Sequence, residues 1–133
     1  MRAEGLLPIV LPAALLERLL TYAAHAAPDE CVGLMFGHGG RVTRLEALPN
    51  ASSTPQTRFV APPQELFAAL READDRGETL IGSYHSHPRS PAWPSRTDLE
   101  APDGTLMLIV GGDAVRVFRI DGGRAAELEL HVV

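Results

Sequence analysis

The stretch GSYHSHPRSPAWPSRTD, residues 82–98, contains two histidines, a serine and an aspartate within a few positions of one another. His85 and His87 stand at the end of a run typical of a strand, so their side chains should point to the same face. Neutral imidazole nitrogen is a common zinc ligand, and two imidazoles that face one point favour a metal ion. A third protein ligand is still required.

Asp98 can supply this third ligand if the chain turns back toward the end of the strand. The intervening loop, residues 88–94, contains three prolines, whose fixed φ angles make such a return less costly in entropy than a glycine loop would. Three protein ligands that leave one position to water are the pattern of a catalytic zinc site. Such a centre lowers the pKa of its water toward about 7 and polarises a carbonyl. We therefore expect His85, His87 and Asp98 to hold a catalytic Zn²⁺ ion.

Simpler explanations of the same residues stay open. Taken alone, His-x-His at a strand end is more often a pair of polar residues than a metal site. Ser95 and Asp98 also form a capping-box variant, in which Asp98 would bond back to the backbone amide of Ser95. The joint occurrence of His-x-His, a proline-rich loop and Ser-x-x-Asp is much rarer than any one of them, which favours the metal site.

The rest of the sequence predicts the elements that must position these residues. A short apolar strand is followed by leucines at helical spacing, which predict a first helix. The GHGG segment predicts the turn of a β-hairpin. Prolines then open a second helix, whose Leu66, Phe67 and Leu70 share one face. This order predicts an α/β (α+β) fold with one mixed sheet flanked by helices. The expected strands cover 6–11, 31–37, 41–48, 79–87, 105–112, 114–120 and 126–133, and the expected helices cover 12–26, 62–78 and 95–101.

Length and charge indicate how many domains the chain forms and which kinds of partner are disfavoured. At 133 residues the chain has the size of one ordinary domain, so we expect a single domain over 1–133. The net charge of −5 and the lack of any Lys/Arg block longer than a pair disfavour nucleic acid as a partner. No run approaches the roughly 20 apolar residues of a membrane span, which disfavours a membrane partner.

The cysteine and the N-terminal segment bear on the compartment. The single cysteine, Cys31, cannot form an internal disulfide, which is compatible with a reducing cytoplasm. It opens an apolar strand without a cationic neighbour, so we interpret it as an inert small hydrophobe rather than a nucleophile. Residues 1–27 imitate a signal peptide, but Glu4, two prolines within the apolar run and Glu17-Arg18 disfavour that interpretation. We therefore expect a cytoplasmic protein.

The segment HSHPRSPAWPSRTD resembles the signature of the JAMM, or MPN+, family, in which His-x-His is followed by seven residues and then Ser-x-x-Asp. PDECVGLMFG supplies Glu30 ahead of a strand, where the family pattern needs a glutamate. The resemblance covers nearly the whole chain and implies an MPN/JAMM domain with cytidine-deaminase-like layering. It also implies a zinc metallopeptidase, of a minimal prokaryotic type, that cleaves peptide or isopeptide bonds after the C-terminal glycine of ubiquitin or ubiquitin-like proteins.

The resemblance assigns roles by position. His85, His87 and Asp98 would be the zinc ligands, Glu30 would be the general base that passes a proton from water to the leaving amine, and Ser95 would donate a hydrogen bond to the oxyanion. Outside the motif, a glutamate between a helix and a strand is most often a solvated charge. For Trp93 and Arg89 two interpretations stay open: contact with a substrate tail or, for Trp93, anchoring of the loop on the core.

The expected partner is a small ubiquitin-like or sulfur-carrier protein with a Gly-Gly tail. The alternative function is a non-catalytic MPN scaffold that binds partners and stabilises a complex, and such relatives generally lack one or more of the metal ligands, all of which stand here. A third reading, a DNA-linked role like that of the similar RadC-type proteins, is disfavoured by the acidic charge.

Overall fold

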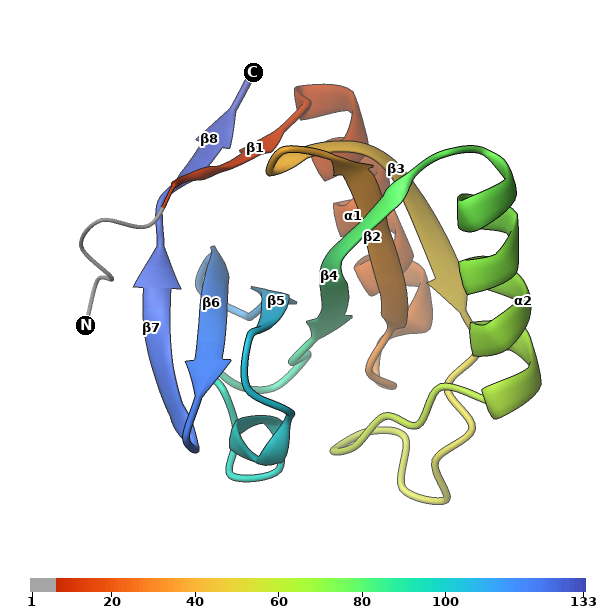
Figure 1. Ribbon diagram of the computed structural model, residues 1–133. Helices are drawn as coiled ribbons and strands as arrows, with labels where there is room; N and C mark the ends of the chain where they lie inside the picture. The colour runs from red at the N-terminus through yellow and green to blue at the C-terminus, as the bar shows by residue number, and fades with distance from the viewer. Residues whose placement is uncertain (1–6) are drawn as a thin grey trace.

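The computed structural model describes residues 7–133, and its elements follow the predicted order closely (Figure 1). Position 6, where the first strand was expected to begin, lies outside the described residues. In chain order the elements are β1 (Ile9–Leu11), α1 (Ala13–Ala26), β2 (Val32–His38), β3 (Arg41–Leu48), α2 (Pro63–Asp75), β4 (Thr79–Ser86), the 3₁₀ helix η1 (Asp98–Glu100), β5 (Thr105–Val110), β6 (Val115–Asp121), β7 (Arg124–Leu128) and β8 (Leu130–Val132).

All eight strands join one mixed sheet in the order β7-β6-β5-β4-β2-β3-β1-β8. The prediction of one closing strand over 126–133 is wrong, because the chain leaves the ladder at Glu129. β7 pairs antiparallel with β6, whereas β8 pairs parallel with β1 at the opposite end of the sheet. The sheet is therefore strongly curled, and Figure 1 shows β8 continuing past β7 to lie along β1. Alternating residues indicate a strand but not its neighbour, so the sequence did not reveal the break.

Helix α1 covers one face of the sheet. Leu19 is fully buried, and other apolar residues of α1 pack beside it against side chains of the strands. Pro12 is the N-cap of α1, so the helix begins one residue later than predicted. The main core cluster contains Ile9, Leu11, Leu19, Cys31, Met35, Val42, Leu45, Tyr84, Leu108, Val110, Val117 and Leu128.

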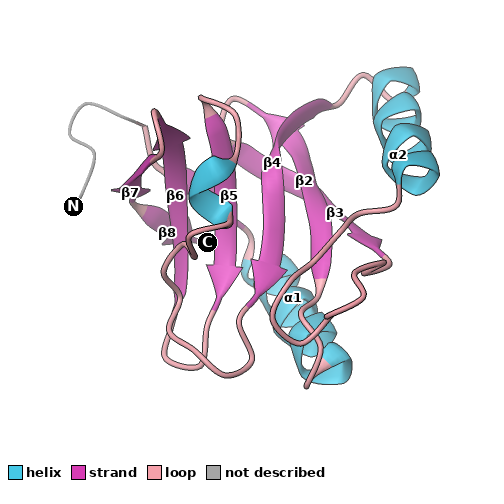
Figure 2. Ribbon diagram, turned by 90° about the horizontal axis from the view of Figure 1, so that it is seen from below, coloured by secondary structure: helices cyan, strands magenta, loops and turns pink. Residues whose placement is uncertain are grey.

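Helix α2 and η1 lie against other parts of the sheet (Figure 2). Ala69 and Ala73 of α2 pack on Leu34 and Phe36. The predicted inner face of α2 is confirmed at Leu66, which packs against this cluster. It is wrong at the other two positions, because Phe67 is 62% exposed and Leu70 is 37% exposed. The small alanines let the helix lie close to β2, a consequence of packing that a ranking by hydrophobicity misses. Between residues 7 and 133 no helix is long and apolar enough to cross a membrane.

Strand β4 carries His85 near its carboxyl end in the centre of the sheet, and His87 follows directly after the strand, which ends one residue earlier than predicted. It pairs antiparallel with β2 and parallel with β5, and the crossover between β4 and β5 contains the motif loop (residues 88–94) and η1. Because side chains alternate along a strand, Tyr84 enters the α1 core while His85 faces the opposite side. The crevice at the carboxyl ends of adjacent parallel strands is a common place for a ligand site in α/β sheets.

Candidate metal centre

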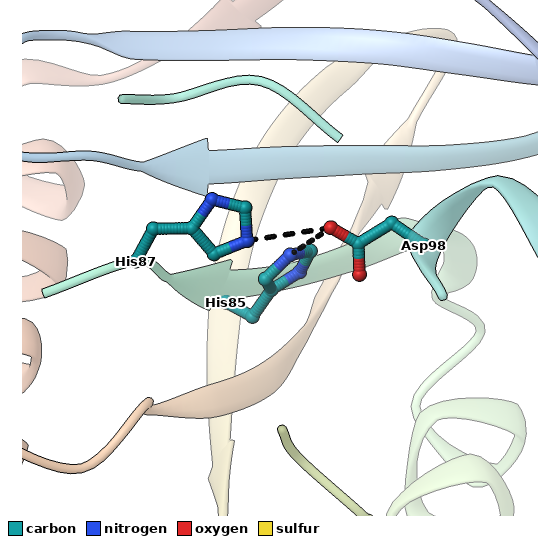
Figure 3. Close-up of side chains that lie close together, drawn as sticks. All are labelled: His85, His87 and Asp98. Atoms are coloured by element: carbon teal, nitrogen blue, oxygen red, sulfur yellow. Dashed lines mark hydrogen bonds and ion pairs between the residues drawn. The ribbon is translucent and has the colours of Figure 1, made fainter. Parts of the chain in front are cut away.

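The structure brings together the three predicted ligands, which lie 13 or fewer positions apart in the sequence (Figure 3). Oδ2 of Asp98 lies 3.1 Å from Nε2 of His85 and 3.3 Å from Nε2 of His87. One ligand atom from each residue lies within 4.8 Å of the other two, and all three residues are buried. His85 comes from the end of β4, His87 from the residue directly after this strand, and Asp98 from the start of η1.

This geometry fits a tetrahedral metal ion. Zinc binds nitrogen at about 2.0 to 2.1 Å, so two ligand atoms on a tetrahedral ion are separated by about 3.3 Å. The separations of 3.1 and 3.3 Å from the carboxylate to the two imidazoles match that value. Two imidazoles and one carboxylate are also the donor types that zinc accepts. His85, His87 and Asp98 could therefore hold the metal.

Neighbouring groups fix both imidazole rings. Nδ1 of His87 donates to the backbone carbonyl of Pro91 at 3.1 Å, which turns Nε2 toward Asp98. The ring of His85 is fully buried and stacks on Phe59 with a centroid distance of 4.5 Å. Hydrogen bonding of the second ring nitrogen sets the tautomer and orientation of a metal-binding histidine. The Pro91 carbonyl thus leaves Nε2 of His87 free to bind a metal.

Asp98 takes part in the capping arrangement as well as in the cluster. Ser95 N–H donates to Oδ2 of Asp98 at 2.9 Å, and Asp98 N–H donates to Oγ of Ser95 at 3.0 Å. The two interpretations of the Ser-x-x-Asp motif are therefore compatible, because the reciprocal bonds hold the carboxylate beside the histidines. The short helix begins at Asp98 rather than at Ser95, so this exchange lies in the turn that leads into it.

The pKa values of the cluster indicate an ionised carboxylate between imidazoles. Burial alone would raise the pKa of Asp98, but its bonds to His85 and His87 lower it well below its usual range. Burial lowers the pKa of His85, which favours the neutral form that binds metals. Burial also opposes the charged form of His87, but its bonds to Asp98 and the Pro91 carbonyl raise its pKa on balance. A metal ion must therefore compete with a proton at His87.

Glu30 and Ser95 line the same cavity as His87. This cavity has a volume of about 430 Å³, and its wall is completed by Gln56, Thr57, Pro88, Arg89, Ser90, Pro91 and Trp93. Glu30 is only 7% exposed, so it is not a solvated surface charge. Burial raises the pKa of Glu30 from 4.5 to about 7, with opposing effects of the nearby His87 and Asp98. A carboxyl group with such a pKa can exchange protons near neutral pH.

Metal-free Glu30→Gln is expected to be more stable than metal-free wild type at about pH 8, with a much smaller difference at about pH 5. Because the folded-state pKa of about 7 exceeds the usual 4.5, the native state holds a proton that the unfolded chain has lost. The free energy of unfolding therefore falls as pH rises through this window, whereas glutamine does not titrate. The difference should approach roughly 3 kcal/mol at high pH. Urea unfolding of chelator-treated protein measures it, and equal differences at both pH values would contradict the prediction.

Asn50 is a structural residue that sequence reasoning missed. Its Nδ2 donates to the carbonyls of Glu30 and Arg58, both at 3.0 Å, and its Oδ1 accepts from the N–H groups of Ser52 and Val60. This one side chain ties Glu30 to the loop that carries Phe59. An asparagine in a segment rich in turn-forming residues predicts a loop, and the bond from Ser52 N–H to Asn50 is such a local turn. The bond from Asn50 to Glu30 joins segments 20 positions apart, so the sequence gives no sign of it.

Trp93 and Cys31 bear on two further predictions. Trp93 packs on Phe118 at 5.4 Å, has the Arg116 guanidinium over its ring at 4.8 Å and also lines the cavity. The loop-anchor interpretation is thus confirmed, and contact with a substrate stays open. Cys31 belongs to the buried core, as expected for a small hydrophobe, and burial raises the pKa of its thiol, which disfavours the reactive thiolate.

Comparisons with known proteins identify the family. Residues 12–121 match the family described as prokaryotic homologues of the JAB domain. A Thermus thermophilus protein named as a probable TtuB-protein conjugate cleaving protease is 37% identical, over 92% of this chain and 82% of the relative. A Mycobacterium tuberculosis protein named as a CysO-cysteine peptidase is 31% identical, over 94% of this chain and 91% of the relative.

Solved structures agree in fold. A solution structure of a Desulfitobacterium hafniense protein has a TM-score of 0.85 at 28% identity and covers 94% of this chain and 92% of its own. A JAB1/MPN domain protein from Archaeoglobus fulgidus has a TM-score of 0.66 at 25% identity and covers 95% of this chain and 98% of its own.

Fold and site together define a metallopeptidase of the JAMM type. The chain belongs to the family of prokaryotic homologues of the JAB domain, which confirms the resemblance seen in the sequence.

Proposed function

We propose that this protein is a zinc-dependent isopeptidase of the cytoplasm that hydrolyses the bond after the C-terminal Gly-Gly of a ubiquitin-like or sulfur-carrier protein. The observation that carries the proposal is that His87, one member of the buried His-His-Asp cluster, lines one cavity together with Glu30 and Ser95. The names of two relatives, a TtuB-conjugate cleaving protease and a CysO-cysteine peptidase, support this substrate class.

The proposed metal ligands are His85, His87 and Asp98. When bound, zinc supplies Lewis-acid chemistry, which polarises the scissile carbonyl and lowers the pKa of water. The Pro91 carbonyl holds His87 in the tautomer with a free Nε2, and the Ser95 N–H holds the Asp98 carboxylate. The protein therefore contributes ligands whose orientation is set before the metal arrives.

Glu30 is the proposed general base. Its carboxylate takes a proton from the attacking water and delivers it to the amine that leaves when the C–N bond breaks. The pKa of about 7 suits both steps, because the group accepts and releases a proton near neutral pH. Asn50 holds the backbone carbonyl of Glu30, so the loop at residues 50–60 fixes the base at the cavity wall.

Ser95 is the proposed oxyanion donor. Its Oγ accepts the N–H of Asp98, which leaves the hydroxyl proton available to the carbonyl oxygen of a substrate. Ser95 also lines the cavity.

Ser95→Ala is expected to lower kcat by about 10² to 10³ with little change in zinc content. Ser95→Thr keeps a hydroxyl and should retain more of the rate. Ser90→Ala is the matched control, because Ser90 lines the same cavity and uses its backbone in its bonds. Equal loss of zinc and rate in Ser95→Ala would show that Ser95 acts by holding Asp98.

The test substrate is TtuB extended by a short peptide after its Gly-Gly, or joined through that glycine to a lysine of a second protein. Wild type should hold about one zinc per chain and release the free Gly-Gly terminus, and chelation should abolish cleavage. The matched substrate replaces Gly-Gly by Ala-Ala. Because the chain has no lysine, every lysine isopeptide in the assay belongs to the substrate.

Two outcomes would overturn the proposal. Wild type that takes up no zinc and binds an intact partner without cleaving it would indicate a scaffold. Cleavage that survives metal removal would indicate a different mechanism.

A further inference from the structure

The carbonyl that orients His87 belongs to a peptide group that is bonded at both of its polar atoms. Pro91 O accepts from Nδ1 of His87 at 3.1 Å and from the N–H of Trp93 at 2.9 Å. The N–H of the same peptide group, on Ala92, donates to Oδ1 of Asp113 at 2.9 Å. One planar amide therefore joins the carboxylate of Asp113 to the imidazole of His87.

The turn that carries Asp113 is built against this peptide group. It consists of residues 111–114 and joins β5 to β6. Gly112 N–H donates to the carbonyl of Ser90 at 2.9 Å, and a side chain at Gly111 would collide with the backbone of Ala92. Ala92 is itself fully buried. The bond to Asp113 is thus part of a fixed contact between the β5–β6 turn and the motif loop.

We propose that Asp113 is a positioning residue of the metal centre, which acts on the ring of His87 through the Pro91–Ala92 peptide group. The inference rests on the proposed function in that His87 must bind the metal. A carboxylate that accepts the N–H of an amide polarises that amide and makes its carbonyl a stronger acceptor. A stronger acceptor holds the proton on Nδ1, fixes the ring and leaves the lone pair of Nε2 for the metal.

The charge of Asp113 supports this role. The N–H of Ala92 lowers the pKa of Asp113, so the carboxylate is ionised at neutral pH. The arrangement resembles in its chemistry the carboxylate–histidine–zinc triad, with a peptide group inserted between carboxylate and histidine. Sequence spacing gives no hint of it, because Asp113 stands 21 positions after Ala92.

The test compares zinc affinity, by competition with a coloured chelator, in wild type, Asp113→Ala and Asp113→Asn. Loss of a group that bonds directly to a metal-binding histidine typically costs 10- to 100-fold in affinity. Because Asp113 acts one amide further out, we expect Asp113→Ala to lose about 10-fold. Asparagine keeps an acceptor oxygen but not the charge, so Asp113→Asn should fall between alanine and wild type.

Asp103→Ala is the matched control. Asp103 also lies in a turn and accepts a backbone N–H, from Gly122 at 2.7 Å, but this bond links its turn to the β6–β7 turn rather than to the motif loop. The zinc affinity of Asp103→Ala should equal that of wild type. An equal loss in Asp103→Ala and Asp113→Ala would overturn the inference, since it would indicate general destabilisation.

A second readout uses the metal-free protein. Nitrogen-15 NMR of the imidazoles should show Nδ1 of His87 protonated in wild type, whether or not Nε2 also holds a proton toward Asp98, and a smaller share of protonated Nδ1 in Asp113→Ala. If wild type binds zinc and both Asp113 variants match it in affinity and tautomer, the inference fails while the proposed function stands. If wild type binds no zinc, the proposed function fails, and an unchanged tautomer in Asp113→Ala then overturns the inference independently.

Discussion

Glu30→Gln is expected to keep about one zinc per chain and to lose at least 10²-fold, and up to about 10⁴-fold, in kcat. Glutamine has nearly the shape of glutamate, so the cavity wall and the backbone bond from Asn50 to residue 30 should persist. It cannot exchange a proton, so water is not activated and the leaving amine is not protonated. The measurement is single-turnover cleavage of the extended TtuB substrate, with zinc content determined on the same sample.

The control for this variant is Glu65→Gln, which makes the same chemical change at an exposed position in the first turn of α2. It should cleave at the wild-type rate. Full activity in Glu30→Gln would remove Glu30 from the mechanism, and loss of zinc from Glu30→Gln would mean that the residue supports the metal instead.

Stability and activity are expected to oppose each other at Glu30. The ionised carboxylate that serves as a base is the form that burial disfavours, which is why its pKa rises to about 7. The same glutamine variant that loses turnover should therefore gain stability above neutral pH in the metal-free state. Such a trade-off is common where a site needs a group that its surroundings destabilise.

The sequence predicted the meeting of His85, His87 and Asp98 because each signal was local. Strand alternation placed His85 and His87 on one face, and the spacing from His87 to Asp98 matched a loop that returns to the strand. The hairpin also formed as expected, with Gly39 and Gly40 both at positive φ in its turn. In each case a few neighbouring residues determined the outcome.

What the sequence could not predict depends on contacts between distant segments. The division of the last predicted strand at Glu129 follows from the curl of the whole sheet, and the inward face of α2 follows from how closely Ala69 and Ala73 approach β2. Asn50 and Asp113 are polar loop residues of common types, and only the fold shows that they bond to the segments that carry Glu30 and His87. Their place near the site is therefore a product of topology.

His87→Ala is expected to lose both zinc and turnover. It removes one of the three proposed protein ligands and leaves the buried Asp98 carboxylate bonded to His85 and the Ser95 N–H. Zinc bound to the native state should raise the unfolding free energy of wild type by about 2.7 kcal/mol when free zinc is 100 times the dissociation constant. The thermal midpoint of His87→Ala should not respond to the same zinc concentration.

The matched control is His131→Ala, which removes an exposed histidine that also bonds to a carboxylate, Oε2 of Glu129 at 2.9 Å. Among the described residues the group able to hold a metal is His85, His87 and Asp98, so zinc should stabilise His131→Ala as much as wild type. Glu30→Gln and His87→Ala together separate metal binding from proton transfer. Glu30→Gln should keep zinc without turnover, whereas His87→Ala should lose both. A His87→Ala protein that still gains stability from zinc would place the metal elsewhere and leave the cluster as a hydrogen-bonded cap.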